Sequence, residues 1–116
     1  MDKTILIVDD QKGVRLLLEE FFIQEGYTVI TAGNGQEAIK ETKEQKVDLI
    51  IMDMKMPGMD GLKAAEVILQ DKYIPIILMT AYAKAEIEEA AMAVGINRCI
   101  VKPFEVLELR EIVVNF

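Results

Sequence analysis

The sequence of 116 residues has no histidine, no serine and no tryptophan, and it has one cysteine, Cys99. Without histidine or serine, neither a Ser-His-Asp nor a Cys-His catalytic group can form. A single cysteine cannot make an intramolecular disulfide, and with no histidine a zinc site has almost no ligands available. These absences exclude a triad hydrolase and a disulfide-stabilised secreted domain, and they leave Cys99 as a candidate core side chain.

Basic charge and long apolar runs are scarce too. Lysine and arginine number 13 against 20 aspartates and glutamates, which gives a net charge of −7. Nucleic-acid binding usually needs a basic face, so we expect no direct contact with nucleic acid. The N-terminal apolar run over residues 5–8 is far too short for a signal peptide or a membrane span. We therefore expect a cytoplasmic protein with no membrane association.

Short apolar runs alternate along the chain with segments of helical periodicity. Five runs are predicted as strands, over residues 4–8, 27–32, 47–52, 75–79 and 97–101. A predicted helix follows each strand, the third over about 60–70 and the last over about 105–114. With 52% hydrophobic residues, a chain of this length can bury one core, so we expect a single domain over residues 1–116.

The strand–helix alternation predicts an α/β fold. Five such units suit a flavodoxin-like (βα)5 three-layer sandwich, with a parallel five-stranded sheet in the order 2-1-3-4-5. Thr28 and Thr31 interrupt the second strand, which places it at a sheet edge. Asn34 and Glu37 then have the spacing of a helix N-cap and its capping-box partner.

Polar side chains follow four of the predicted strands. Asp9 and Asp10 follow the first strand, Asp53 the third, Thr80 the fourth and Lys102 the fifth. In an open parallel sheet, ligands bind beyond the carboxyl ends of the strands. The order 2-1-3-4-5 places these four strands side by side, so we expect the five side chains to converge on one crevice.

The charges of this cluster suggest its chemistry. Three carboxylates and one ammonium sum to −2, which a divalent cation would neutralise. Carboxylate and carbonyl oxygens suit Mg²⁺, and Mn²⁺ is an alternative. Beside such an ion, Asp53 could attack phosphorus and form an acyl phosphate. Lys102 and the ion would offset charge on the phosphoryl oxygens, and Thr80 would donate a hydrogen bond to one of them.

Four motifs resemble the receiver domain of two-component response regulators, over essentially the whole chain. They are ILIVDDQ (5–11), IIMDMKMPGMDG (50–61), MTAY (79–82) and VKPF (101–104). Within that family, the segments DDQ, GVRLLL (13–18), DMK and MTAY look most like the receivers of sporulation phosphorelays. All four motifs in this order, at the expected strand ends, are far more specific than any one of them.

The resemblance implies a phosphoacceptor rather than an enzyme. Asp53 would take a phosphoryl group from a phosphohistidine donor, either a histidine kinase or a histidine phosphotransfer protein. Asp10 and Asp53 would bind Mg²⁺ by their side chains, Asp9 directly or through water, and Lys55 by its backbone carbonyl. The domain would assist its own phosphorylation and dephosphorylation. It would signal to a downstream phosphotransferase or an output domain.

The resemblance also implies how the remaining motif residues act. Thr80 and Lys102 would contact the phosphoryl group, and the Lys102–Pro103 peptide bond would be cis. Lys55 and Tyr82 would flank the site and tune the lifetime of the phosphoryl group.

One position departs from the family pattern. Many members carry tyrosine or phenylalanine three residues before the site lysine, where this chain has Cys99. We therefore expect output through the first helix and the strand-end loops. The partner surface is expected around Gln11, Val14, Arg15 and Leu18, on a protein that is monomeric.

Three alternatives remain open. A strand-end aspartate and Mg²⁺ also serve phosphatases of the haloacid dehalogenase type, but these expect a second aspartate where this chain has Lys55. Residues 33–38 fit the pattern G-x-G-x-x-A of dinucleotide-binding proteins, although a lone match is weak. The chain could also be the receiver part of a longer DNA-binding transcriptional regulator.

Overall fold

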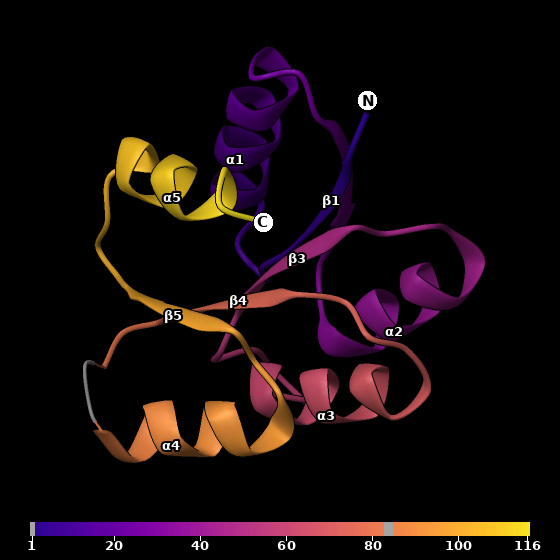
Figure 1. The fold of residues 1–116 in the computed structure, drawn as a ribbon, viewed down its shortest axis with the longest axis vertical. Helices are drawn as coiled ribbons and strands as arrows, with labels where there is room; N and C mark the ends of the chain where they lie inside the picture. The colour runs from indigo at the N-terminus through magenta and orange to yellow at the C-terminus, as the bar shows by residue number, and fades with distance from the viewer. Residues whose placement is uncertain (1, 83–84) are drawn as a thin grey trace.

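The computed structural model describes residues 2–82 and 85–116. Strands and helices alternate along the chain, as predicted (Figure 1). The strands are β1 (Thr4–Val8), β2 (Thr28–Ala32), β3 (Leu49–Asp53), β4 (Ile76–Thr80) and β5 (Arg98–Val101). The helices are α1 (Lys12–Gln24), α2 (Gly35–Glu44), α3 (Gly61–Asp71), α4 (Ala85–Val94) and α5 (Val106–Val113).

The five strands form one parallel sheet in the order β2-β1-β3-β4-β5. Helices α1 and α5 cover one face of the sheet, and α2, α3 and α4 cover the other (Figure 1). The predicted three-layer α/β sandwich and its strand order are therefore confirmed.

The central strands are apolar on both faces because both faces are covered. In β1, Leu6 and Val8 pack toward α2 and α3, while Ile5 and Ile7 pack toward α1 and α5. Successive side chains of a strand point to opposite faces, so a strand between two helical layers needs a continuous apolar run. In contrast, β2 is only partly buried and lies at the sheet edge, as its threonines predicted.

The helix after β2 begins as the sequence predicted. Asn34 Oδ1 accepts a hydrogen bond from the Glu37 backbone N–H at 2.8 Å, and Glu37 Oε1 accepts one from the Gly33 N–H at 2.9 Å. These bonds satisfy two backbone donors at the start of α2. The glycine-rich segment 33–38 thus forms the capped start of α2, directly after the edge strand β2. This position weakens its interpretation as a dinucleotide-binding motif.

The ends of β3 and β4 lie one residue beyond their predicted positions, at Asp53 and Thr80. The ladder continues there because Met54 N donates to Met79 O at 2.8 Å and Lys102 N donates to Thr80 O at 2.7 Å. Asp53 and Thr80 are therefore held by the rigid sheet rather than by a loop. Within the described ranges, none of the helices has the length and apolar character needed to cross a membrane.

Candidate functional site

The carboxyl edge of the sheet brings the five predicted site residues together. Asp9 and Asp10 directly follow β1, Asp53 and Thr80 are the last residues of β3 and β4, and Lys102 directly follows β5. A depression of about 730 Å³ lies at this edge, and Asp10, Asp53, Thr80 and Lys102 all line it. Asp9 is fully buried beside it. The predicted convergence on one crevice is therefore confirmed.

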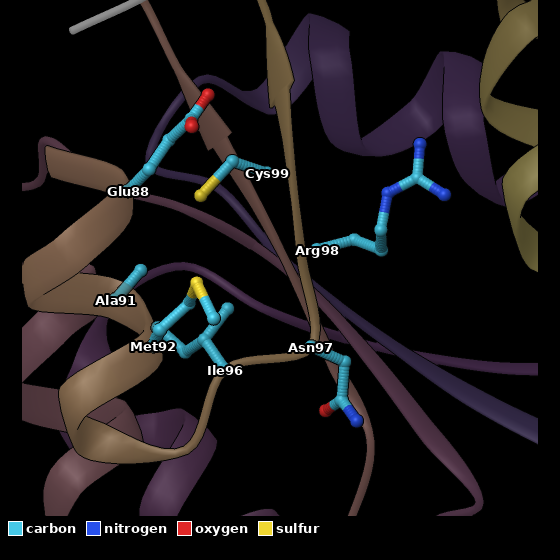
Figure 2. Close-up of a pocket in the computed structure, with 7 residues that line it drawn as sticks. All are labelled: Glu88, Ala91, Met92, Ile96, Asn97, Arg98 and Cys99. Carbon is cyan, nitrogen blue, oxygen red and sulfur yellow. The ribbon is translucent and has the colours of Figure 1, made fainter. Parts of the chain in front are cut away.

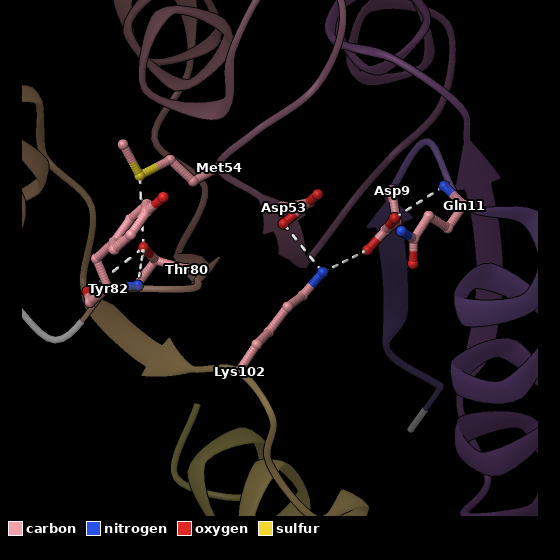
Figure 3. Close-up of polar contacts among 7 residues, drawn as sticks. All are labelled: Asp9, Gln11, Asp53, Met54, Thr80, Tyr82 and Lys102. Atoms are coloured by element: carbon pink, nitrogen blue, oxygen red, sulfur yellow. Dashed lines mark hydrogen bonds and ion pairs between the residues drawn. The ribbon is translucent and has the colours of Figure 1, made fainter.

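Lys102 joins two of the carboxylates. Its ammonium nitrogen Nζ lies 3.1 Å from Asp9 Oδ2 and 3.1 Å from Asp53 Oδ1 (Figure 3). The Lys102 side chain is 27% exposed, whereas that of Asp9 is completely buried. The Lys102–Pro103 peptide bond is cis, as the family resemblance implied.

Burial and repulsion shift the acid–base properties of this group. Burial raises the pKa of Asp53 above its usual 3.8, and the negative charges of Asp9 and Asp10 raise it further, against the opposing effect of Lys102. Burial alone would lower the pKa of Lys102, but its hydrogen bonds to Asp53 and Asp9 outweigh that effect and raise it. The cluster thus holds a firmly protonated lysine and a carboxylate whose charge is incompletely compensated.

The three aspartates have the arrangement of a cation site. One oxygen from each of Asp9, Asp10 and Asp53 lies within 4.8 Å of the others. Asp10 is exposed to solvent, so an ion can reach the group. Hard oxygen donors and an uncompensated negative charge fit Mg²⁺ or Mn²⁺. Lys55 lines the same depression from the loop after β3, while its role as a carbonyl ligand stays a prediction.

The Thr80 hydroxyl is buried and already has contacts. It lies 3.6 Å from Met54 Sδ, and it accepts a hydrogen bond from the Tyr82 N–H at 3.1 Å (Figure 3). Met54 was not among the predicted site residues. Its position directly after Asp53 was the available signal, because that position begins the loop that borders the depression.

Gly61 sets how closely α3 approaches the site. A Cβ atom at this position would lie 2.4 Å from the Asp53 carbonyl oxygen, and the Gly61 N–H donates to Met54 O at 2.7 Å. Only glycine permits this approach without movement of the backbone. Gly61 is the last residue of the motif over residues 50–61, but its contact with the Asp53 backbone could not be predicted from the sequence.

A second, more apolar groove of about 340 Å³ lies beside Lys102, between α1 and the segment after β5. Val14, Leu17 and Phe104 line it. Leu18, expected on the partner surface, lines the floor of this groove, but it is 1% exposed and belongs to the core, so its side chain offers a partner almost no surface. The helix turns its exposed apolar side one position earlier, at Leu17, which is 60% exposed.

Cys99 lies in β5, facing α4 (Figure 2). It is partly buried against the core, as predicted for a small apolar side chain, and it shares a pocket with Glu88, Ala91 and Met92. Burial raises the pKa of the Cys99 thiol, and the nearby charge of Glu88 adds to this effect. A thiol in these surroundings is poorly reactive, because the nucleophilic form is the thiolate.

Comparisons with known proteins agree with this geometry. The family model for the response regulator receiver domain matches residues 5–114. Sporulation initiation phosphotransferase F of Bacillus subtilis is 41% identical over 119 residues, covering 100% of this chain and 94% of the relative. Transcriptional regulatory protein PdtaR of Mycobacterium tuberculosis is 38% identical over 108 residues, and the match covers 92% of this chain but only 53% of that relative.

Solved structures show the same similarity in three dimensions. Chemotaxis protein CheY4 of Vibrio cholerae superposes with a TM-score of 0.94 at 30% identity, covering 99% of this chain and 98% of that one. Response regulator TrrA of Thermotoga maritima, determined in complex with Mg²⁺-BeF, superposes with a TM-score of 0.88 at 40% identity and 97% coverage of both chains.

Proposed function

The chain belongs to the response regulator receiver family, whose members accept a phosphoryl group, and from this premise we propose that Asp53 is the phosphoacceptor of this protein. The observation that carries the proposal is the position of Asp53: a carboxylate at a strand end, paired with Lys102 and beside two further carboxylates. A surface aspartate with no such neighbours would have no means of stabilising the charge of an incoming phosphoryl group.

Asp53 acts as the nucleophile. A carboxylate oxygen of Asp53 forms a bond to phosphorus while the bond from phosphorus to the donor's histidine nitrogen breaks. The donor imidazole leaves, and an acyl phosphate remains on Asp53. The sheet holds Asp53 in a fixed place, so little orientation entropy is lost at the moment of attack.

Asp9, Asp10, Asp53 and the backbone carbonyl of Lys55 would hold a divalent cation, Mg²⁺ or, alternatively, Mn²⁺. When bound, the ion supplies positive charge that offsets the charge of the phosphoryl oxygens. Asp10 is the exposed member of the group and would take the ion from solvent. Asp9, which is buried and paired with Lys102, orients the lysine as well as serving the ion.

Lys102 and Thr80 stabilise the transferred group. The Lys102 ammonium group is already beside Asp53 Oδ1 and would also contact a phosphoryl oxygen. The Thr80 hydroxyl would donate to another phosphoryl oxygen and, to do so, would turn away from Met54 Sδ. Lys55 and Tyr82, which line the depression, would control the access of hydrolytic water and so the lifetime of the acyl phosphate.

Kinases or phosphotransfer proteins are the partners that membership of this family implies. We propose a histidine kinase or a histidine phosphotransfer protein as donor, and a downstream phosphotransferase or an output domain as recipient of the signal. The receiver part of a longer transcriptional regulator is the second possibility, because the match to PdtaR covers about half of that protein.

Intact-protein mass spectrometry after incubation with acetyl phosphate tests the proposal. We expect a gain of one phosphoryl group in the wild type with Mg²⁺, and none with EDTA or in Asp53→Asn. A gain in Asp53→Asn equal to that of the wild type would refute the assignment of Asp53. A phosphatase of the haloacid dehalogenase type would instead turn over excess phosphate ester without a persistent mass change.

A further inference from the structure

The first turn of helix α1 carries two basic residues, Lys12 and Arg15. Its first turn contains no acidic residue, and the Gln11 side chain makes no capping hydrogen bond. Arg15 lies at this end of the helix, where its backbone N–H donates to Gln11 O at 3.1 Å. The partial positive charge of a helix N-terminus disfavours a cation there. A residue that breaks a local rule of this kind usually contributes elsewhere.

The Arg15 side chain makes its contact at the site. Its guanidinium nitrogen Nη1 donates a hydrogen bond to the backbone carbonyl oxygen of Asp9 at 2.8 Å. That carbonyl belongs to the peptide bond that joins Asp9 to Asp10. The two carboxylate oxygens of Asp9 are occupied by other groups, because Oδ1 accepts from Gln11 N and Oδ2 pairs with Lys102.

We propose that Arg15 is a positioning residue for the cation site. Its guanidinium group fixes the Asp9–Asp10 peptide and so keeps the Asp10 carboxylate beside those of Asp9 and Asp53. Asp10 is the exposed member of the three, and the orientation of its backbone decides where its side chain begins. The inference rests on the proposed function, since it concerns the same carboxylates.

The turn after β2 leaves space for the guanidinium group. A Cβ atom at Gly33 would lie 3.4 Å from Arg15 Nη1, and Glu37 holds the Gly33 N–H at 2.9 Å. The Arg15 side chain therefore extends from α1 across the end of β1 to the turn that follows β2. A larger side chain at residue 33 would displace the Arg15 guanidinium group without altering any charge.

Charge and position predict opposite effects when Arg15 is replaced. Removing a cation close to three carboxylates would strengthen the binding of a divalent ion. Releasing the Asp9–Asp10 peptide would weaken that binding, because groups that orient metal ligands typically contribute a factor of about 10 to 100 to metal affinity. The sign of the change therefore separates the two roles.

The experiment is a Mn²⁺ titration at fixed ionic strength, followed by electron paramagnetic resonance of free Mn²⁺. For Arg15→Met we expect the dissociation constant to rise about tenfold, and for Arg15→Lys to rise less, since lysine retains one donor. Lys12→Met is the matched control, because it removes a cation from the same turn of α1. Its affinity should be unchanged or higher.

Thermal unfolding without metal establishes that each variant is folded. Gly33→Val is a second test of the positioning role, because it crowds the Arg15 guanidinium group and keeps every charge. It should also weaken Mn²⁺ binding. If Arg15→Met and Gly33→Val bind Mn²⁺ as tightly as the wild type, or more tightly, the positioning role is refuted while the cation site stands. If the wild type itself does not bind Mn²⁺, both the cation site and this inference are refuted.

Discussion

The Lys102 ammonium nitrogen Nζ lies 3.1 Å from Asp53 Oδ1, although the two residues belong to strand ends that are not neighbours. Strand β4 lies between β5 and β3 in the sheet, so the lysine side chain reaches past the end of β4. The lysine side chain thus connects the two outer members of three adjacent strand ends. Parallel strands place their carboxyl ends on the same edge, so residues 49 positions apart in the chain can form an ion pair.

Lys102→Met should slow phosphorylation without removing the cation site. The variant keeps the apolar stem and all three carboxylates but loses the charge beside Asp53 Oδ1. Loss of one preorganised charge-stabilising donor typically costs about 10²–10³ in rate, so we expect at least a hundredfold slower uptake from acetyl phosphate, measured by intact mass. Lys63→Met removes an exposed lysine on α3 and should phosphorylate normally. A wild-type rate in Lys102→Met would contradict the role of this lysine.

Asp10→Ala should abolish the stabilisation of the protein by Mg²⁺. An ion that binds only the folded state raises its melting temperature, and that rise should vanish when the exposed ligand is removed. In EDTA the variant should melt at the same temperature as the wild type or higher, since one of three mutually repelling charges is gone. The measurement is thermal unfolding with and without Mg²⁺. A preserved Mg²⁺-dependent rise would rule out Asp10 as a ligand.

The pH dependence of stability should reveal Asp53. The pKa of Asp53 in the folded protein is raised above 3.8, the ordinary value that it has in the unfolded chain. At a pH between 3.8 and the raised pKa, the folded state therefore holds more protons than the unfolded chain. The contribution of Asp53 to stability therefore falls as the pH rises from 3.8 through the raised pKa. In EDTA at neutral pH, Asp53→Asn should be more stable than the wild type, and the difference should shrink as the pH is lowered toward 3.8.

The titration of Lys102 does not affect the comparison of the wild type with Asp53→Asn in this pH range. Its pKa is raised above 10.5, so the stability it contributes is present throughout the acid and neutral range and is lost only at higher pH. Denaturant unfolding of both proteins at several pH values provides the measurement. Equal stabilities of wild type and Asp53→Asn across the range would contradict the raised pKa of Asp53.

Gly61→Ala should destabilise the fold and disturb the site together. The added Cβ would lie 2.4 Å from the Asp53 carbonyl oxygen, so α3 or the end of β3 must move. Overpacking of this kind costs about 1–3 kcal/mol of unfolding free energy, measured with denaturant. Gly13→Ala is the control, because a Cβ there meets nothing within 4 Å and should slightly stabilise α1. If Gly61→Ala were as stable as the wild type, the close approach of α3 to the Asp53 carbonyl oxygen would not require glycine at position 61.

The sequence predicted the features that depend on periodicity and chain order. Continuous apolar runs identified the buried strands, and the threonines of β2 placed that strand at the edge. The residues at the strand ends then converged because parallel strands share an edge. The N-cap of α2 was found because the hydrogen bond from the Glu37 N–H to Asn34 Oδ1 spans only three residues.

The features that the sequence did not predict depend on distances between separate elements. The contact of Arg15 with the Asp9 carbonyl depends on how α1 sits over β1, and the approach of Gly61 to Asp53 depends on the packing of α3. Leu17 and Leu18 are both apolar and both line the groove beside α1, and only packing decides that Leu17 is exposed while Leu18 is buried. Helical spacing alone did not fix the rotation of that helix.

The most direct test of the account is to locate the phosphoryl group itself. The wild type is treated with acetyl phosphate and Mg²⁺, and borohydride then reduces the acyl phosphate to an alcohol, which converts the modified aspartate to homoserine. Peptide mapping by tandem mass spectrometry identifies the converted residue. The account predicts homoserine at position 53 and nowhere else. Conversion at Asp9 or Asp10 with Asp53 intact would contradict it.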